Sequence, residues 1–169
     1  MISFKIIKDS KTLISEIKKY KLKKKKIGFV PTLGGLHKGH FELIKLAKKK
    51  TDIVVLSIFL NPLQFNSKND FIKYPSNLNS DKRKINKKKV NILYLPSMKE
   101  VFPSKRIKRI KASSKSNKLC GKFRKGHFDG VVTVLKSLFE QVLPNIAFFG
   151  EKDFQQNLII KDLILKYKL

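Results

Sequence analysis

The stretch IGFVPTLGGLHKGH, residues 27–40, decides the fold of this chain. It opens with a short apolar run that ends at Pro31, which is typical of a buried β-strand. A helix is predicted next, over residues 39–50. The apolar stripe of that helix consists of Phe41, Leu43, Ile44 and Ala47. A strand that runs through a glycine-rich loop into a helix is the first half of a βαβ unit.

Strand-like and helix-like segments alternate along the rest of the chain. Further strands are predicted at residues 53–60, 91–96 and 145–149, with a marginal one at 107–112. Further helices are predicted at residues 10–20, 80–89, 131–143 and 153–169. Strands separated by helices imply right-handed βαβ crossovers. The sequence therefore predicts one α/β domain over residues 1–169, with a parallel sheet and helices on both of its faces.

Length and composition exclude several classes of protein. The 169 residues suffice for a buried core, and a hydrophobic content of 41% excludes a disordered polymer. No apolar run reaches the roughly 18–20 residues that cross a bilayer. The N-terminus lacks the pattern of a signal peptide. The single Cys120 excludes an internal disulfide and a cysteine metal cage. A cytoplasmic protein is the simplest interpretation.

The formal net charge of +27 raises the question of a nucleic-acid partner. Basic residues cluster at 18–26, 82–89 and 105–118. However, only four of the 39 basic residues are Arg. Arg is the residue that proteins mostly use to recognise base edges and to bind phosphates with two hydrogen bonds. The basic runs also lack the interleaved aromatic residues that stack on single strands. We therefore favour a solvated, compositionally drifted surface over a polyanion-binding one, although both interpretations stay open.

The loop after the first predicted strand combines features that suit a triphosphate. Gly34 and Gly35 let the backbone approach a ligand without a Cβ atom, so that backbone donors could meet phosphate oxygens. Gly39 opens a helix, and the free N–H groups of a helix start favour anions. His37 and His40 are three residues apart and can point the same way. The helix dipole disfavours a charged His40, so we expect a neutral imidazole that becomes a donor when nucleotide binds.

Two other interpretations of this loop stay open. The two histidines could be incidental residues at a helix start. They could also be a zinc pair, but zinc usually takes three protein ligands, and His127 lies in a different loop with no cysteine nearby. A nucleotide site is the interpretation that we favour, and no metal-binding residue is predicted.

Two later loops also follow predicted strands. In the first, Asn61 and Gln64 place amide groups that can orient a hydroxy acid without adding charge. In the second, Gly150 permits close approach, Lys152 can neutralise phosphate oxygens, and Asp153 can cap a helix or accept from a ribose hydroxyl. Each loop alone is equally consistent with an ordinary strand end or a solvated turn. Because ligands of parallel sheets bind beyond the carboxyl ends of the strands, we expect the loops to act together.

In its motifs, the chain resembles the pantothenate synthetase family. The loop 31–40 is similar to the ATP-binding His-x-Gly-His loop of that family, and residues 61–65 are similar to its substrate loop. Residues 74–75, 95–97, 124–128 and 149–156 recur in family order. The His-x-Gly-His element is shared by a wider nucleotidyltransferase superfamily that includes class I aminoacyl-tRNA synthetases. The resemblance implies a Rossmann-like fold and a homodimer.

The resemblance also implies a reaction and a set of site residues. ATP with Mg would adenylate pantoate and release pyrophosphate, and β-alanine would then displace AMP. His40 would be the catalytic histidine, Gln64 would bind pantoate and β-alanine, and Gln156 would bind pantoate. The ATP site would consist of Leu33, Gly34, Gly35, Leu36, His37, Lys38, Gly39, His40, Gly150, Glu151, Lys152 and Asp153. No membrane and no nucleic acid are expected among the partners.

The chain departs from the family pattern in three respects. Leu33 stands where Met is usual, and Lys125 stands where Pro is usual. The family's smaller C-terminal domain, with a loop that closes over ATP, has no counterpart before Leu169. We therefore expect weak ATP binding and slow turnover from these residues alone. Two other functions stay open, a nucleotidyltransferase acting on a phosphorylated substrate and a basic nucleic-acid-binding module.

Overall fold

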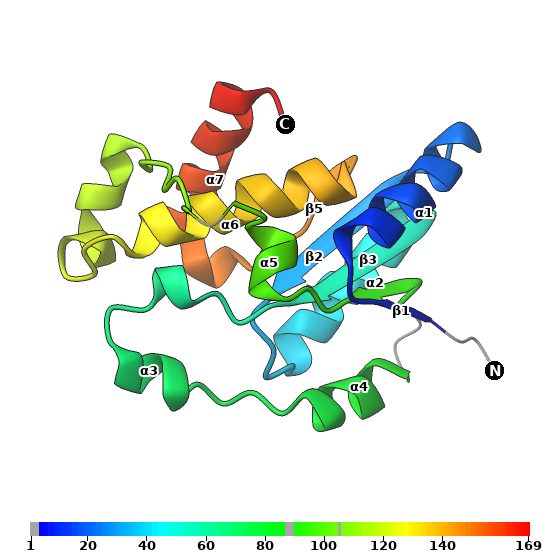
Figure 1. Cartoon of the computed structure of the whole chain (residues 1–169), viewed down its shortest axis with the longest axis horizontal. Helices are drawn as coiled ribbons and strands as arrows, with labels where there is room; N and C mark the ends of the chain where they lie inside the picture. Colours follow the sequence, from blue (N-terminus) through cyan, green and yellow to red (C-terminus); the bar gives the residue numbers. More distant parts are fainter. Residues whose placement is uncertain (1–3, 87–89, 105) are drawn as a thin grey trace.

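The computed structural model describes residues 4–86, 90–104 and 106–169, which form a five-stranded sheet flanked by helices (Figure 1). The strands are β1 (Lys5–Ile7), β2 (Ile27–Thr32), β3 (Ile53–Ile58), β4 (Ile92–Tyr94) and β5 (Ile146–Ala147). Their order in the sheet is β1-β4-β3-β2-β5, and every pairing is parallel. The predicted parallel sheet is confirmed.

Helices connect the strands, as the alternation in the sequence predicted. They are α1 (Ser10–Leu22), α2 (Lys38–Lys50), α3 (Lys68–Ile72), α4 (Leu78–Asn86), α5 (Met98–Val101), α6 (His127–Val142) and α7 (Phe154–Tyr167). Short 3-10 turns occur at η1 (Pro62–Gln64), η2 (Ser114–Asn117), η3 (Leu119–Lys122) and η4 (Glu151–Asp153). Asp9 caps α1, because its carboxylate accepts from the Thr12 amide at 2.8 Å.

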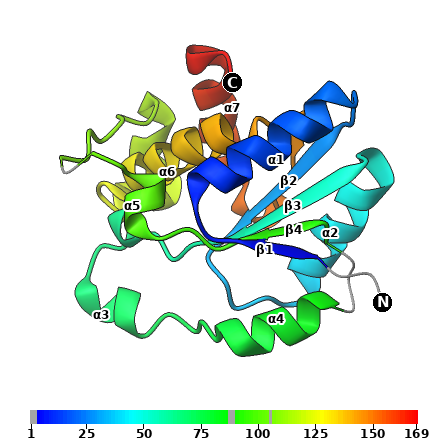
Figure 2. The ribbon, with the colours of Figure 1, turned by 45° about the vertical axis from the view of Figure 1, so that its right-hand side comes forward.

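Two apolar cores cover the two faces of the sheet, because successive side chains of a strand point to opposite sides. On β3, Val55 belongs to one core, and Val54 and Leu56 belong to the other. The first core joins the sheet to α1, α6 and α7, and the second joins it to α2 and α4. Figure 2 shows α1 and α6 on one side of the strands and α4 on the other. Helices on both faces are therefore confirmed.

The marginal strand predicted at residues 107–112 is wrong. This run lies against α6, where side chains satisfy its amides in place of a neighbouring strand. The Ile110 amide donates to the Thr133 hydroxyl at 2.9 Å, and the Ala112 amide donates to the Asp129 carboxylate at 2.9 Å. Ile107, Ile110 and Ala112 are half-buried, and the basic residues between them are exposed.

A strand that the sequence analysis did not predict forms one edge of the sheet. Lys5 to Ile7 pair with Ile92 to Tyr94, and Ile7 alone of the three is buried. Three residues are too few to show a period of two. The end of the basic helix predicted at residues 80–89 lies in part outside the described residues. None of the described helices is long and apolar enough to span a membrane.

Candidate functional site

The topology brings three loops together at the carboxyl ends of β2, β3 and β5. Because β2 lies between β3 and β5 in the sheet, the loops that follow these three strands meet where the chain turns to opposite sides of the sheet. This is the position at which open parallel sheets bind ligands. A cavity of about 210 Å³ lies there. It is lined by Pro31, Thr32, Leu33, His40, Phe59, Gln64, Tyr74, Val131, Val134, Leu135, Leu138, Phe149, Asp153 and Gln156.

This cavity collects predicted site residues from all three loops. His40, Gln64 and Gln156 line it together with Asp153. Its polar groups stand against an apolar wall from α6, a combination typical of a small-molecule site. Among the described residues that line it, Lys and Arg are absent. Its volume is below the roughly 300–1,000 Å³ of sites for drug-sized ligands, so it suits a small acid better than a whole nucleotide.

The two loop histidines cap α2 and contact each other. The ring of His37, the N-cap residue, accepts from the Gly39 amide at 3.1 Å through Nδ1. The His40 ring accepts from the His37 amide at 3.3 Å, also through Nδ1. The ring centroids are 4.1 Å apart. His40 lines the cavity, whereas His37 is exposed.

The hydrogen bond from the His37 amide determines the tautomer of the His40 ring. Because Nδ1 accepts a hydrogen bond, the proton of the neutral imidazole lies on Nε2, which is then free to donate. Burial lowers the pKa of His40 from its usual 6.5, and the neighbouring His37 lowers it further. The carboxylates of Asp81 and Asp153 act in the opposite direction. The neutral imidazole that the sequence predicts for the free protein agrees with this balance of effects.

The glycines of the loop serve close packing between two loops. Gly34 and Gly35 have φ angles of +92° and +65°, which glycine adopts at little cost. A Cβ atom on Gly35 would lie 2.5 Å from the Pro75 carbonyl oxygen. The segment before α4 therefore sits against the loop at the position where the sequence analysis expected a ligand to approach.

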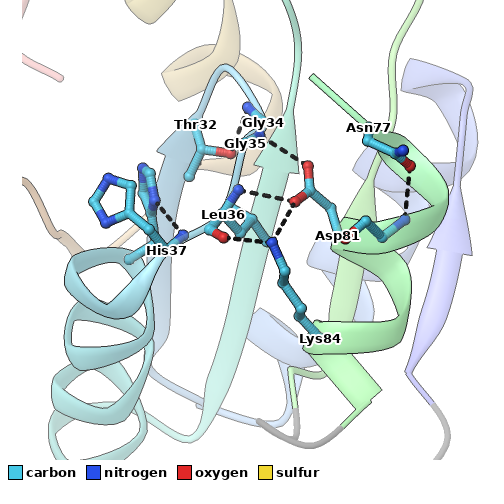
Figure 3. Close-up of polar contacts among 10 residues, drawn as sticks. Thr32, Gly34, Gly35, Leu36, His37, Asn77, Asp81 and Lys84 are labelled. Carbon is cyan, nitrogen blue, oxygen red and sulfur yellow. Dashed lines mark hydrogen bonds and ion pairs between the residues drawn. The ribbon is translucent and has the colours of Figure 1, made fainter. Parts of the chain in front are cut away.

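The backbone donors expected for phosphate are largely engaged within the protein. The Gly34 amide donates to the Thr32 hydroxyl, and the amides of Gly35 and Leu36 donate to the buried carboxylate of Asp81 (Figure 3). The His40 and His37 rings accept hydrogen bonds from two more amides, at positions 37 and 39, so five loop amides have partners. The expectation that the Gly34–Gly35 backbone offers free donors to phosphate is therefore wrong for this structure.

The loop at residues 61–65 is fixed by α6. The fully buried side chain of Asn61 donates to the Gly130 carbonyl and to Gln64 Oε1, each at 3.1 Å. Because its oxygen is engaged, Gln64 has its NH₂ group free to donate. His127 Nδ1 lies 2.6 Å from the Gln64 carbonyl oxygen, which can only accept, so Nδ1 carries the proton. A Cβ atom on Gly130 would lie 2.2 Å from the Leu63 carbonyl oxygen. Through its hydrogen bond to Gln64 Oε1, Asn61 orients the Gln64 side chain.

The third loop contributes unequally. Asp153 and Gln156 line the cavity, whereas Glu151 and Lys152 are exposed in η4. Gly150 is half-buried, and its carbonyl accepts from the Asn157 side chain at 3.0 Å. Glu151 and Lys152, which were predicted to belong to the ATP site, therefore lie on the surface next to Asp153, which lines the cavity.

The buried His127 makes stability dependent on pH. Burial lowers the pKa of His127 from its usual 6.5, and Arg124 lowers it further. The unfolded chain then binds a proton that the folded chain does not bind, so stability is complete above about pH 6.5 and falls as the pH drops through the folded pKa. We expect the urea midpoint to fall between pH 7 and 5, and to fall less in His127→Gln, which keeps a donor for Gln64. Equal pH dependence in both proteins would contradict this assignment.

Sequence reasoning missed part of the site. Tyr74 lines the cavity, and burial raises the pKa of its hydroxyl. It is held by an edge-on contact with Phe65, which also contacts Phe71. Nothing in the spacing of residues 65–74 indicates that this exposed-looking segment folds back over the strand ends. The apolar wall from α6 was predicted as core and also serves the cavity.

Comparison with known proteins identifies the family. The family model for Pantoate-beta-alanine ligase matches residues 5–169. The chain belongs to this family. Pantothenate synthetase of Thermoanaerobacter sp. (strain X514) is 45% identical over 148 residues, which are 88% of this chain and 52% of that protein. Pantothenate synthetase of Buchnera aphidicola subsp. Acyrthosiphon pisum (strain 5A) is 46% identical over 161 residues, 94% of this chain and 56% of that protein.

Solved structures of the family have the same fold. Pantoate-beta-alanine ligase from Francisella tularensis, solved in complex with beta-gamma ATP and beta-alanine, superposes with a TM-score of 0.93 at 41% identity. That match covers 98% of this chain and 63% of the other. Pantothenate synthetase from Thermus thermophilus gives 0.89 at 33% identity, covering 98% and 58%. The Rossmann-like fold is confirmed, and the chain spans about half the length of the curated relatives that it matches.

Proposed function

We propose that this chain provides the ATP- and pantoate-binding domain of a pantothenate synthetase. The reaction joins pantoate to β-alanine in two steps, with release of pyrophosphate and then AMP. The observation that carries the proposal is that His40, Gln64 and Gln156, from three separate loops, line one cavity in a chain of this family.

In the first step the pantoate carboxylate attacks the α-phosphorus of ATP, so two anions must come together. The protein lowers this barrier by positioning and by donors placed where charge develops. Nε2 of His40 is such a donor at the mouth of the β2 loop. Gln64 and Gln156 offer amides to pantoate in a cavity whose described lining residues add no competing cation.

In the second step the β-alanine amine attacks the carbonyl carbon of the adenylate, and AMP leaves with the bonding electrons of the C–O bond. Gln64 would hold the β-alanine carboxylate, since Asn61 engages its side-chain oxygen and leaves its NH₂ group to donate. The amine nitrogen loses a proton to solvent as the amide forms, and His40 stays neutral throughout.

ATP enters this proposal as its magnesium complex. Groups of three His, Cys, Asp or Glu side chains that could hold a metal are absent among the described residues. The phosphates of ATP would therefore carry the metal as part of the substrate. We include a homodimer and a cytoplasmic location in the proposal, on the strength of the family resemblance.

Pyrophosphate release tests the proposed function. The chain is incubated with ATP, magnesium and pantoate, with and without β-alanine. We expect pyrophosphate release by these residues alone to be slow. Without β-alanine it should stop near one equivalent, because the adenylate stays bound, and it should continue when β-alanine is added. Absence of both pantoate-dependent pyrophosphate and ATP binding would overturn the proposal.

Substitution of the two cavity glutamines separates the ligands. We expect Gln64→Ala and Gln156→Ala to weaken pantoate binding about tenfold to a hundredfold, the usual loss for a hydrogen bond to a charged group. ATP binding should change little, because the cavity that holds both amides suits the smaller ligand. Calorimetric titration with each ligand measures the two losses. Equal losses for ATP and pantoate would contradict this division of the site.

A further inference from the structure

A buried carboxylate from α4 binds the backbone of the loop that follows β2, residues 33–37. Asp81 is 1% exposed, and its two oxygens accept from the amides of Gly35 at 2.9 Å and Leu36 at 2.8 Å (Figure 3). These contacts join positions 45 and 46 residues apart in the chain. Asp81 is absent from the lining of the cavity that contains His40, Gln64 and Gln156, and it lines a neighbouring cavity of about 220 Å³ that shares Leu33 with the first.

Lys84 completes the arrangement one helical turn later. Its ammonium donates to the Leu36 carbonyl at 2.9 Å and lies 4.0 Å from Asp81. Both polar groups of the Leu36 backbone are thus held by α4, its N–H by Asp81 and its C=O by Lys84. The Leu36 side chain is also buried, in the same core as Ile85 of α4. Leu36 directly precedes the N-cap of α2, so fixing it fixes the start of the helix that carries His40.

The chemistry of the contact requires a carboxylate. Two converging N–H donors need two acceptors, and an ionised carboxylate supplies both, whereas an amide side chain supplies one acceptor and one donor. Burying such a charge is costly unless it is hydrogen-bonded and paired, and here both conditions are met. The cost is otherwise unexplained beside a site that receives a polyanion, because a negative charge there repels phosphate.

We propose that Asp81 and Lys84 form a clamp that preorganises the loop at residues 33–37 for nucleotide binding. By this proposal α4 belongs to the ATP site, although neither side chain lines the cavity that contains His40. The clamp rests on the proposed function, since it assigns these positioning residues to ATP. It holds the peptide between Gly35 and His37 in one conformation before nucleotide arrives, and thereby keeps His40 and the α2 N-terminus in place. Binding then avoids the entropy loss of ordering a glycine-rich loop.

Asp81→Asn tests the clamp, with Asp70→Asn as the matched control. Asp70 lies on the same β3–β4 connection and is exposed, so its substitution makes the same charge change away from the loop. In Asp81→Asn we expect amide exchange at Gly35 and Leu36 to rise about tenfold or more, because one donor loses its acceptor. ATP affinity should fall about tenfold, while pantoate affinity stays within about twofold. The NMR titration of His40, which faces His37, Asp81 and Asp153, should shift to lower pH. Asp70→Asn should change none of these.

Lys84→Met keeps the test decisive if Asp81→Asn does not fold. The Lys84 side chain is 46% exposed, so its loss leaves the core intact. It should raise exchange at Leu36 and lower ATP affinity about threefold to tenfold. Unchanged exchange at both amides in the folded variants overturns the clamp. Increased exchange with unchanged ATP affinity overturns its assignment to the nucleotide. If the unaltered chain binds no ATP, the proposed function fails, and amide exchange still decides whether the clamp exists.

Discussion

His40→Ala is expected to abolish formation of pantoyl-adenylate. The substitution removes the Nε2 donor that the cavity presents where the reacting phosphate would lie, and removal of one such donor typically costs about 10²–10³-fold in rate. Pantoate-dependent pyrophosphate release measures the loss. The fold should survive, because the described contacts of His40 are one capping hydrogen bond and one ring contact with His37. Loss of a cap costs about 1 kcal/mol, a small part of the stability of a domain.

The control for this variant is Glu42→Ala. Glu42 is exposed on the same helix and pairs with Lys45 at 3.4 Å, a surface ion pair of little energetic weight. We expect wild-type pyrophosphate release from it. Formation of adenylate by His40→Ala at the wild-type rate would show that the catalytic assignment is wrong.

Gly130→Ala is expected to lower the stability of the fold. In an ordinary helix interior this change stabilises by about 1 kcal/mol. Here the added Cβ atom would lie 2.2 Å from the Leu63 carbonyl oxygen and 2.7 Å from the Gln64 amide nitrogen, both of them backbone atoms. Overpacking of this kind costs about 1–3 kcal/mol, so steric strain should outweigh helix propensity. Because η1 must move away from α6, pantoate binding should fall as well.

Gly150→Ala serves as the stability control. A Cβ atom there meets nothing within 4 Å, and the φ angle of Gly150 is −73°. We expect a slight gain in stability from reduced freedom of the unfolded chain. Urea unfolding of both variants gives the comparison. A Gly130→Ala variant as stable as the parent would mean that η1 shifts without cost, and that α6 does not fix the position of Gln64.

The sequence predicted those parts of the fold in which local pattern and tertiary environment agree. The apolar run of β3 is continuous because the strand is buried on both faces, and the strand was therefore recognised. The glycine-rich loop, the capped start of α1 and the buried stripe of α6 each carry a local signal as well. By contrast, β1 is three residues long, and residues 107–112 have a strand-like composition but bond to α6 side chains.

The site was predicted in its residue types more fully than in its contacts. His40, Gln64, Asp153 and Gln156 meet in one cavity because parallel strands deliver their following loops to the same edge. The partner of the loop amides could not be inferred, because Asp81 stands within a basic, polar helix and looks like a solvated residue. Its role depends on a contact across more than 40 residues, which no local pattern records.

The connection between β3 and β4 would also couple the two proposed ligands. It contains Gln64, which offers an amide to the cavity, Tyr74, which lines the same cavity, and Asp81, which binds the loop before α2. One continuous stretch of chain therefore contacts both halves of the site. If pantoate restrains its first part, the last part has less freedom left to lose when ATP binds. Thermodynamic reciprocity then requires each ligand to strengthen the binding of the other by the same factor.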